Sequence, residues 1–226
     1  MIDWQAVWLS IRLAAATSVV LVVLGMPLAW WLARSRRRWR PLVEAVVALP
    51  LVLPPTVLGF YLLVAMGPNG PLGMLWEGTT GGRLAFTFEA LLIASVIYSL
   101  PFAVQPFAVA FAAVDRSLLE ASWTLGRSGP ATFFRVVVPL AAGGILTGIV
   151  LSFAHTLGEF GVVLMVGGSI PGETRTLSIS IYDRVQALDY AGAAATALPL
   201  LLFSFVILAL TYGLRGITVA PWATRR

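Results

Sequence analysis

Residues 115–139 lie between two long apolar stretches and read DRSLLEASWTLGRSGPATFFRVVVP. Ser117 and Glu120 match the Ser-x-x-Glu pattern, in which the two side chains cap the start of a helix. Gly126 is placed to end that helix in a left-handed conformation, and Pro130 suits the first turn of the next helix. The segment therefore predicts a short helix, a turn and a second helix that leads into the following apolar stretch.

The predicted short helix has one face of small and apolar side chains. That face consists of Leu118, Ala121, Ser122 and Leu125. A helix of this kind that projects from a membrane protein can dock in a groove of a partner. On spacing alone, an ordinary amphipathic helix at the membrane interface is the better interpretation.

Apolar stretches on both sides of this segment predict a membrane protein. Hydrophobic residues make up 59% of the chain and charged residues 11%, whereas a soluble domain carries about 25% charged residues. A transmembrane helix needs about 20 apolar residues. Five stretches qualify, at residues 8–33, 42–66, 84–114, 136–166 and 191–214. We therefore expect one all-α polytopic domain over residues 1–226, with an uncleaved first span.

The arginines predict the orientation of this bundle in the cell (inner) membrane. Alternate connecting segments and the C-terminus carry eleven of the 15 basic residues, namely Arg34, Arg36, Arg37, Arg38, Arg40, Arg116, Arg127, Arg135, Arg215, Arg225 and Arg226. The opposite side has Arg83, Arg175 and Arg184, with Arg12 near it. Because positively charged loops stay in the cytoplasm, we expect the N-terminus outside and the C-terminus inside. The net charge of +5 thus indicates membrane topology, with lipid and not nucleic acid as the surroundings.

Missing residue types exclude several kinds of chemistry. The chain has no cysteine, no lysine and one histidine, His155. A thiol nucleophile, a Cys or His cluster for metal, a P-loop lysine and a Schiff-base lysine are therefore absent. We expect no catalytic residue, no metal site and no cofactor. If ATP drives this protein, a separate chain must hydrolyse it.

A proline-rich stretch, LPLVLPPTVLGFYLL, occupies residues 49–63. Pro50, Pro54 and Pro55 each lack a backbone donor and free a carbonyl upstream. A membrane helix tolerates this where neighbours or a water-filled path satisfy the backbone. The stretch is either a kinked packing helix, which is the simpler interpretation, or part of a translocation path that includes Pro54, Pro55 and Thr56.

A charged residue, Glu159, interrupts the fourth apolar stretch, within HTLGEFG at residues 155–161. A carboxylate inside a bilayer is costly, and it is usually functional or paired. His155 lies four residues earlier on the same helical face, so a His–Glu pair is one interpretation. A bare carboxylate would repel an anion, which argues against direct binding of an anionic substrate by Glu159.

Hydroxyl side chains near Glu159 offer donors for an oxyanion. Thr147, Ser152 and Thr156 can line such a path, or they can bond the carbonyls of their own helix, which is the commoner use.

On the outer side, residues 67–83 are rich in glycine and proline and predict an irregular loop. Residues 167–190 predict a short interfacial helix, with Ile181, Val185 and Leu188 on one face.

The segment at residues 115–139 resembles the EAA loop of bacterial ABC importer permeases. That loop reads Glu-Ala-Ala, three residues, Gly, nine residues, then Ile-x-Leu-Pro. Here Glu120, Ala121 and Ser122 stand at the first positions, Gly126 falls at the required offset, and residues 136–139 read VVVP and end at Pro139. The stretches LPLVLPPT, LGEFG and IPGETRT further resemble molybdate permeases, and sulfate permeases carry a looser form.

This resemblance implies a type I ABC importer permease architecture that works as a homodimer with one pore on its two-fold axis. Two ATPase subunits would dock against Glu120, Ala121, Ser122, Gly126 and Pro139. A periplasmic or other extracytoplasmic binding protein would deliver molybdate on the opposite side. Tungstate and sulfate are alternative cargoes. A different class, a stand-alone secondary transporter or channel, would carry several intramembrane charges and paired repeats.

Overall fold

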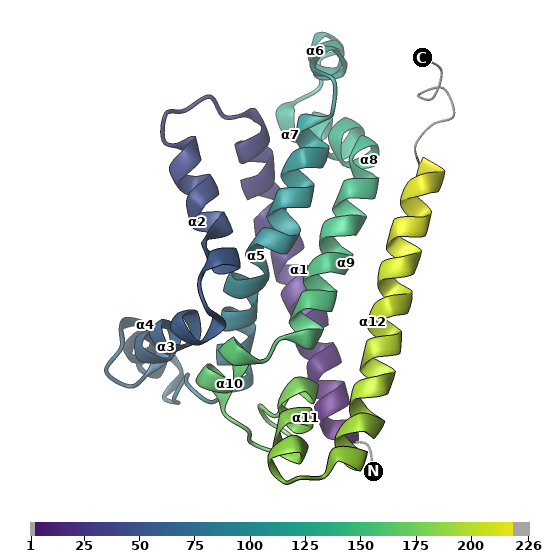
Figure 1. The fold of residues 1–226 in the computed structure, drawn as a ribbon. Coiled ribbons are helices and arrows are strands. Elements are labelled where there is room, and N and C mark those ends of the chain that lie inside the picture. The colour runs from purple at the N-terminus through teal and green to yellow at the C-terminus, as the bar shows by residue number, and fades with distance from the viewer. Residues whose placement is uncertain (1–2, 219–226) are drawn as a thin grey trace.

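The computed structural model describes residues 3–218, and its regular structure within that range is helical throughout. Three helices form the centre of the bundle: α1 (Trp4–Arg34), α5 (Phe88–Ala112) and α9 (Ala142–Gly158). A fourth long helix, α12 (Tyr190–Thr218), lies on the outside against α9 and α11 (Leu177–Gln186) (Figure 1). The all-α prediction is therefore confirmed.

The described helices include three long enough and apolar enough to cross a membrane, or up to five if each of two bent pairs counts as one span. The first, third and fifth predicted stretches correspond to α1, α5 and α12. The second and fourth correspond to the bent pairs. Arg225 and Arg226, which entered the charge argument, lie outside the described residues.

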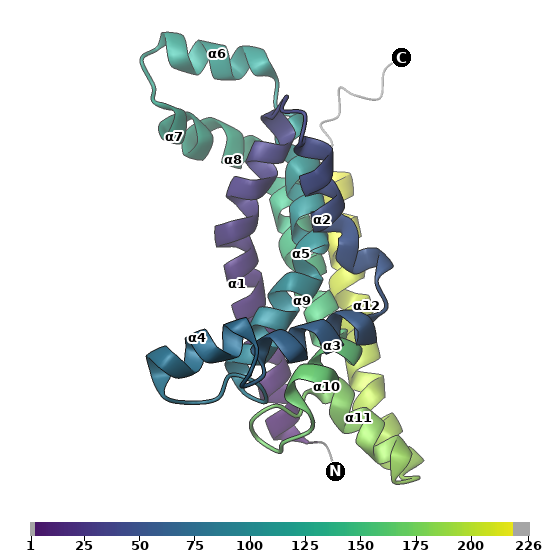
Figure 2. The ribbon, with the colours of Figure 1, turned by 90° about the vertical axis from the view of Figure 1, so that its left-hand side faces the viewer.

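The second predicted stretch is split into α2 (Arg40–Val52) and α3 (Pro55–Met66), which meet at an angle of 110°. Pro54 has no N–H to continue α2, and Pro55 occupies the start of α3. As a result, α2 runs along the bundle while α3 lies across it (Figure 2). The kink that the prolines predicted is therefore a sharp corner.

The fourth predicted stretch is divided twice. It begins within η1 (Phe133–Val137), a π-helical turn between α7 (Gly129–Thr132) and α8 (Val138–Leu140), and these three short elements are bent by 77° from α9. It breaks again at Glu159 and Phe160, before α10 (Gly161–Gly167). The vertical part of this span is therefore α9 alone, and the predicted range of 136–166 was too long.

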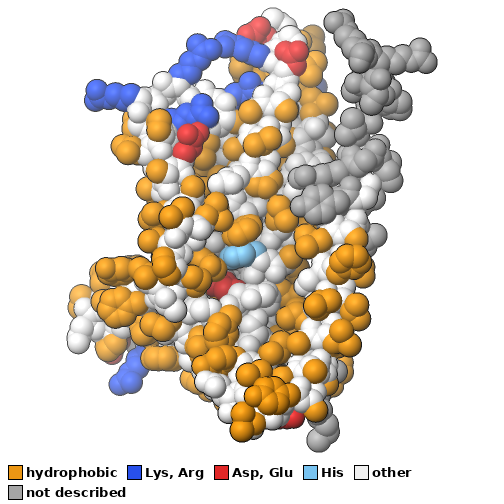
Figure 3. Space-filling model, viewed as in Figure 1, with side chains coloured by type: hydrophobic (Ala, Val, Ile, Leu, Met, Phe, Trp, Pro, Cys, Tyr) orange, Lys and Arg blue, Asp and Glu red, His pale blue; other side chains and the backbone are white. Residues whose placement is uncertain are grey.

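The two ends of the bundle differ. The arginine-rich link after α1 and helix α6 (Arg116–Thr124) lie at one end, while the N-terminus, α4 (Pro71–Thr80) and α11 lie towards the other (Figures 1 and 2). On the face shown in Figure 3, blue side chains gather mainly at the α6 end, above a broad band of hydrophobic side chains. This asymmetry matches the arginine distribution along the sequence.

The loop and helix predicted at the N-terminal end need two corrections. Residues 67–83 were predicted to be an irregular loop, but they contain α4, which starts at Pro71 and is ended by left-handed Gly81. The short helix predicted within residues 167–190 is confirmed as α11. However, Leu188 lies beyond the end of α11 with a φ of 60°, so it does not share a helical face with Ile181.

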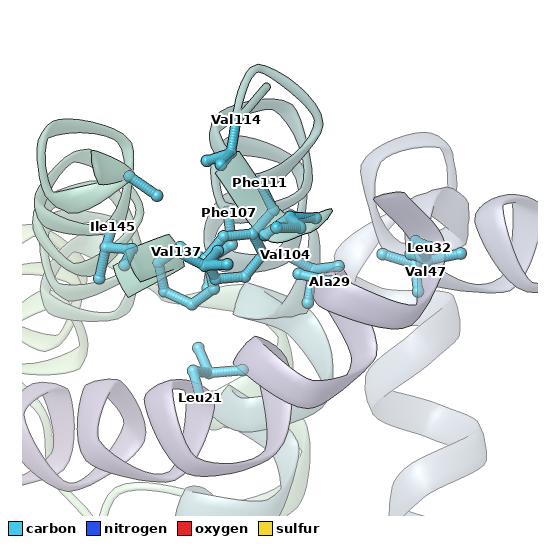
Figure 4. Close-up of a cluster of buried hydrophobic side chains, with 13 residues drawn as sticks. Leu21, Ala29, Leu32, Val47, Val104, Phe107, Phe111, Val114, Val137 and Ile145 are labelled. Carbon is cyan, nitrogen blue, oxygen red and sulfur yellow. The ribbon is translucent and has the colours of Figure 1, made fainter. Parts of the chain in front are cut away.

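The largest apolar core lies towards the α6 end of the bundle. Phe107 and Phe111 of α5 are fully buried at its centre, next to Val104 and Val137 (Figure 4). Trp30 of α1 meets Phe111 edge-on, with ring centroids 5.9 Å apart. Leu119 of α6 is buried in the same cluster, so the short terminal helix is anchored in the core.

Candidate functional site

Helix α6 begins two residues earlier than the capping pattern predicted. Its N-cap is Asp115, whose carboxylate accepts a hydrogen bond from the Ser117 N–H at 2.9 Å. This bond lowers the pKa of Asp115 below its ordinary value. Glu120 turns to Arg116, with Nε and Oε1 2.8 Å apart. The predicted Ser117–Glu120 capping box is therefore wrong, because Asp115 already satisfies the free amide.

The C-terminal end of α6 closes as predicted. Gly126 has a φ of +76°. Its N–H donates to the Trp123 carbonyl at 2.9 Å, and the Arg127 N–H donates to the Ser122 carbonyl at 3.1 Å. These two bonds form the Schellman arrangement that ends a helix at a left-handed glycine. The short helix thus has a fixed length and a fixed exit direction.

Two side chains hold α6 against the bundle. Leu119 is buried in the main core, and Ser122 Oγ lies 2.9 Å from Thr132 Oγ1 of α7. Leu118 and Ala121 remain exposed, and Leu125 is 82% exposed. The predicted small and apolar face is therefore outward for these three residues, but Ser122 faces inward.

The five predicted coupling residues lie at two separate places in the fold. Glu120, Ala121 and Ser122 are on α6, and Gly126 ends it, whereas Pro139 lies in α8, past the turn. The Ser122–Thr132 contact joins the two parts. Pro139 precedes the 77° bend into α9, so the segment forms a continuous elbow from α6 to a central helix of the bundle.

A second group of polar residues lies between α5 and α9. Ser99 Oγ is 2.9 Å from His155 Nδ1 and 2.9 Å from Thr156 Oγ1. The His155 ring stacks on Phe102, with centroids 3.9 Å apart and planes at 22°. Figure 3 shows the histidine, in pale blue, at mid-height on the surface of the bundle. A polar and aromatic contact therefore replaces the predicted His–Glu pair.

Glu159 follows the last turn of α9 and is only 4% exposed. Within the described residues, neither carboxylate oxygen has a hydrogen-bond partner of standard geometry, although the buried Ser95 hydroxyl lies close enough to interact with the carboxylate. The predicted pairing with His155 is wrong because the His155 ring turns to Ser99 and Phe102. Within the described residues, the carboxylate thus has a weak contact with Ser95 and no ion pair.

The other predicted path residues divide into two groups. Ser152 donates to the Ile149 carbonyl and Thr147 to the Gly143 carbonyl of their own helix, which is the commoner use of such hydroxyls. Pro54 and Thr56 are exposed at the corner between α2 and α3. Pro55 packs so closely on Gly161 that a Cβ at Gly161 would lie 2.8 Å from the Pro55 Cβ.

The corner at Pro54 and the break at Glu159 therefore lie side by side. Gly59 of α3 also packs on α10, where its added Cβ would come within 2.8 Å of the Met165 Cβ. Because both contacts leave no room for a side chain, α3 and α10 are held as one packed pair.

Sequence reasoning missed Ser95, Ser99 and Phe102 of α5. Two serines four residues apart within an apolar stretch place two hydroxyls on one helical face, and that spacing was the available signal. It also missed Arg34, whose partners are backbone carbonyls 77 and 80 residues away. Nothing in the local sequence indicates that contact.

Comparisons with known proteins agree on one architecture. The sequence model of the family described as "Binding-protein-dependent transport system inner membrane component" matches residues 25–215. The molybdenum transport system permease protein ModB of Azotobacter vinelandii is 56% identical over 214 residues, which cover 94% of this chain and 94% of that protein. The protein of the same description from Escherichia coli K12 is 34% identical over 223 residues, covering 99% and 94%.

A solved structure shows the same fold. It is a bacterial alginate ABC transporter in complex with an alginate pentasaccharide-bound periplasmic protein. One of its chains matches with a TM-score of 0.70 at 17% identity, over 95% of this chain and 80% of that chain. The fold of nearly the whole chain is therefore shared with a chain of a bacterial ABC transporter.

Proposed function

Because this chain belongs to the family of binding-protein-dependent transport system inner membrane components, we propose that it is the membrane-spanning permease subunit of an ATP-driven molybdate importer. The cargo rests on the Azotobacter vinelandii relative, a molybdenum transport system permease that is 56% identical over nearly the whole chain. The observation that carries the mechanism is α6, a short helix that is fixed at both ends and exposes Leu118, Ala121 and Leu125.

The proposed partner of α6 is a separate ATPase subunit, in two copies. The exposed apolar side chains of α6 suit a groove on such a partner, and the arginines at this end indicate the cytoplasmic side. Leu119 and the Ser122–Thr132 contact tie α6 to the bundle. When ATP closes the two ATPase subunits on each other, α6 would therefore move as a rigid body. The segment from α6 through α8 would transmit this movement to α9.

The opposite end is the proposed docking side for an extracytoplasmic binding protein. The family description itself names dependence on a binding protein. Helices α4 and α11 lie at this end, and the ion pair between Arg175 and Asp183, at 3.5 Å, fixes the segment before α11. With this orientation the N-terminus is outside, and the chain ends in the cytoplasm.

We further propose a homodimer with the pore between the two copies. The isolated chain leaves large apolar side chains exposed on α2, α3 and α12, including Val52, Tyr61 and Phe205. Lipid covers part of this surface, and a second copy would cover the rest. The path would run past the Pro54 corner and Glu159, which lie next to the packed pair of α3 and α10, and this pair would then act as a gate in an alternating-access cycle.

Co-purification of the permease with the ATPase of the same importer tests the role of α6. Gly126→Pro removes the N–H that bonds the Trp123 carbonyl and forbids the positive φ. Glu120→Arg reverses the charge at the exposed position that pairs with Arg116. We expect both variants to reach the membrane but to lose most of the bound ATPase. Unchanged association and transport in both would refute the proposed coupling role.

Gly129→Ala is the matched control in the same segment. Gly129 has an ordinary φ, and an added Cβ there would meet nothing within 4 Å. This variant should therefore retain the ATPase at the level of the unmodified chain. If this variant also loses the ATPase, any change in the segment disturbs assembly. The result for Gly126→Pro would then say nothing specific about the end of α6.

Uptake assays in proteoliposomes test the cargo and the energy source together. The permease, its ATPase and its binding protein are reconstituted with labelled molybdate, tungstate or sulfate. We expect ATP-dependent uptake of molybdate. Uptake that needs no ATPase would show a stand-alone transporter, and a clear preference for sulfate would overturn the proposed cargo.

A further inference from the structure

Arg34, the last residue of α1, reaches across to the end of a different helix. Its Nη2 donates to the Phe111 carbonyl at 3.1 Å and to the Val114 carbonyl at 2.8 Å. Its guanidinium lies over the Trp30 ring, 5.1 Å from the centroid. Val114 directly precedes Asp115, the N-cap of α6. One side chain thus joins α1 to the corner where α5 passes into α6.

The opposite end of α1 carries a comparable contact. Ser10 Oγ accepts a hydrogen bond from the Leu177 N–H at 2.7 Å, and this bond is buried. Leu177 is the first residue of α11, so Ser10 is joined to the start of the helix at the far end. Ser10 and Arg34 are 24 positions apart on one unbroken helix, which corresponds to about 36 Å.

We propose that α1 transmits movement between α6 and α11. Arg34 and Ser10 are the positioning residues that attach the two ends of α1. Phe111 belongs to the last turn of α5, Val114 to the short link between α5 and α6, and Leu177 to the first turn of α11. A displacement of α6 that shifts the link at Val114 would therefore be passed to α1 through Arg34. This inference rests on the proposed function, because it assigns the Arg34 end of α1 to the ATPase side and the Ser10 end to the binding-protein side.

The readout is how strongly the cargo-loaded binding protein stimulates ATP hydrolysis by the reconstituted complex. This ratio compares one complex with and without the binding protein, so it is insensitive to a smaller yield of folded complex. We expect Arg34→Met and Ser10→Ala each to lower the ratio by about 2- to 30-fold, the range that single linking residues span in coupled proteins. Arg34→Lys, which keeps a donor, should recover part of the ratio.

The double variant separates a shared link from two independent defects. If both residues act through α1, combining them should add little to the larger single effect, because residues that act through one link are not additive. Full multiplication of the two effects, or an unchanged ratio in Arg34→Met, would overturn the proposal. If Arg34→Met does not assemble, the same criterion applies to Arg34→Lys combined with Ser10→Ala.

Two control variants match these changes in chemistry and position. Arg37→Met removes an arginine from the same end of the bundle, where Arg37 lies over Trp39. Ser18→Ala removes a buried hydroxyl of α1 that bonds the Ala14 carbonyl of its own helix. Both should keep the stimulation ratio. If the unmodified chain neither binds the ATPase nor responds to the binding protein, the proposed function itself fails, and that outcome is distinct from loss in the variants alone.

Discussion

At the residue scale, Glu159 is the side chain whose surroundings fit its chemistry least. It is buried at the break between α9 and α10, and within residues 3–218 its oxygens accept no hydrogen bond of standard geometry, with the Ser95 hydroxyl as a weak polar contact. A buried polar group left without a partner costs about 1–3 kcal/mol. Such a cost at the packed pair of α3 and α10 suggests that function, and not stability, retains this carboxylate.

We therefore expect Glu159→Gln to raise the thermal midpoint of the purified complex and to lower molybdate uptake. A buried carboxyl group is costly either as the charged form or because it must take up a proton, and the amide has nearly the same shape but avoids both costs. For a chain of this size, each kcal/mol corresponds to about 2–4 °C. Thermal unfolding in lipid nanodiscs measures the first effect, and proteoliposome uptake measures the second.

Glu77→Gln on exposed α4 serves as the control for Glu159→Gln, because it makes the same chemical change where water already surrounds the side chain. Both quantities should stay unchanged in this variant. A lower midpoint for Glu159→Gln would show that the carboxylate has a stabilising partner in the assembled complex and would contradict the prediction.

At the element scale, α9 approaches α5 through two glycines four residues apart. A Cβ at Gly148 would lie 2.8 Å from Phe107 Cδ1 and 2.9 Å from the Ala103 carbonyl oxygen. A Cβ at Gly144 would collide with the Ala110 side chain. In membranes, small residues at this spacing allow two helix backbones to pack closely. The elbow from α6 therefore ends in a tightly packed helix.

Gly148→Ala should destabilise the bundle by about 1–3 kcal/mol, the usual cost of overpacking a filled core. The neighbours of the new methyl group are a fully buried aromatic ring and a backbone carbonyl, which have little room to move. Thermal unfolding of the purified chain measures this loss. Gly158→Ala, on the same helix but with nothing within 4 Å of the new Cβ, should show no comparable loss, and equal loss in both would contradict the packing argument.

The sequence predicted the positions of the helices better than the corners and ends that separate them. Apolar length alone located the regions that became α1, α5 and α12, and Gly126 marked the end of α6. The prolines at residues 50–55 indicated a kink, but the 110° corner depends on how α3 packs on α10. Asp115 replaced Ser117 as the N-cap because either side chain can reach a free amide there, and only the path of the chain after α5 decides between them.

Contacts between distant segments were beyond sequence reasoning. His155 and Glu159 share a helical face, yet the His155 ring turns to Ser99 and Phe102 on α5. The turn of helix alone gives no preference between these partners. Arg34 entered the sequence argument only as one of the arginines that indicate topology, although its hydrogen bonds to the last turn of α5 and to the link before α6 place it next to the start of α6. The roles proposed for these residues remain predictions.

At the scale of the whole molecule, the uneven arginine distribution sets the expected orientation. Because the chain contains no cysteine, a single introduced thiol reports its own position. Leu125→Cys, at the end of α6, should react with a membrane-impermeant maleimide only after the cells are opened. Thr80→Cys, on exposed α4 at the other end, should react in cells whose inner membrane is intact. The reverse pattern would overturn the orientation and the ATPase side assigned to α6.

The corner at Pro54 also bears on how cells handle copies that have not yet assembled. Helix α2 has 13 residues, or about 20 Å of helix, which is shorter than the roughly 30 Å of hydrocarbon that a span must cross. A lone copy would therefore leave the lipid thinned or poorly sealed beside α3. We expect membrane proteases to degrade such unassembled subunits quickly. This degradation would match the amount of permease to the amount of its partner subunits.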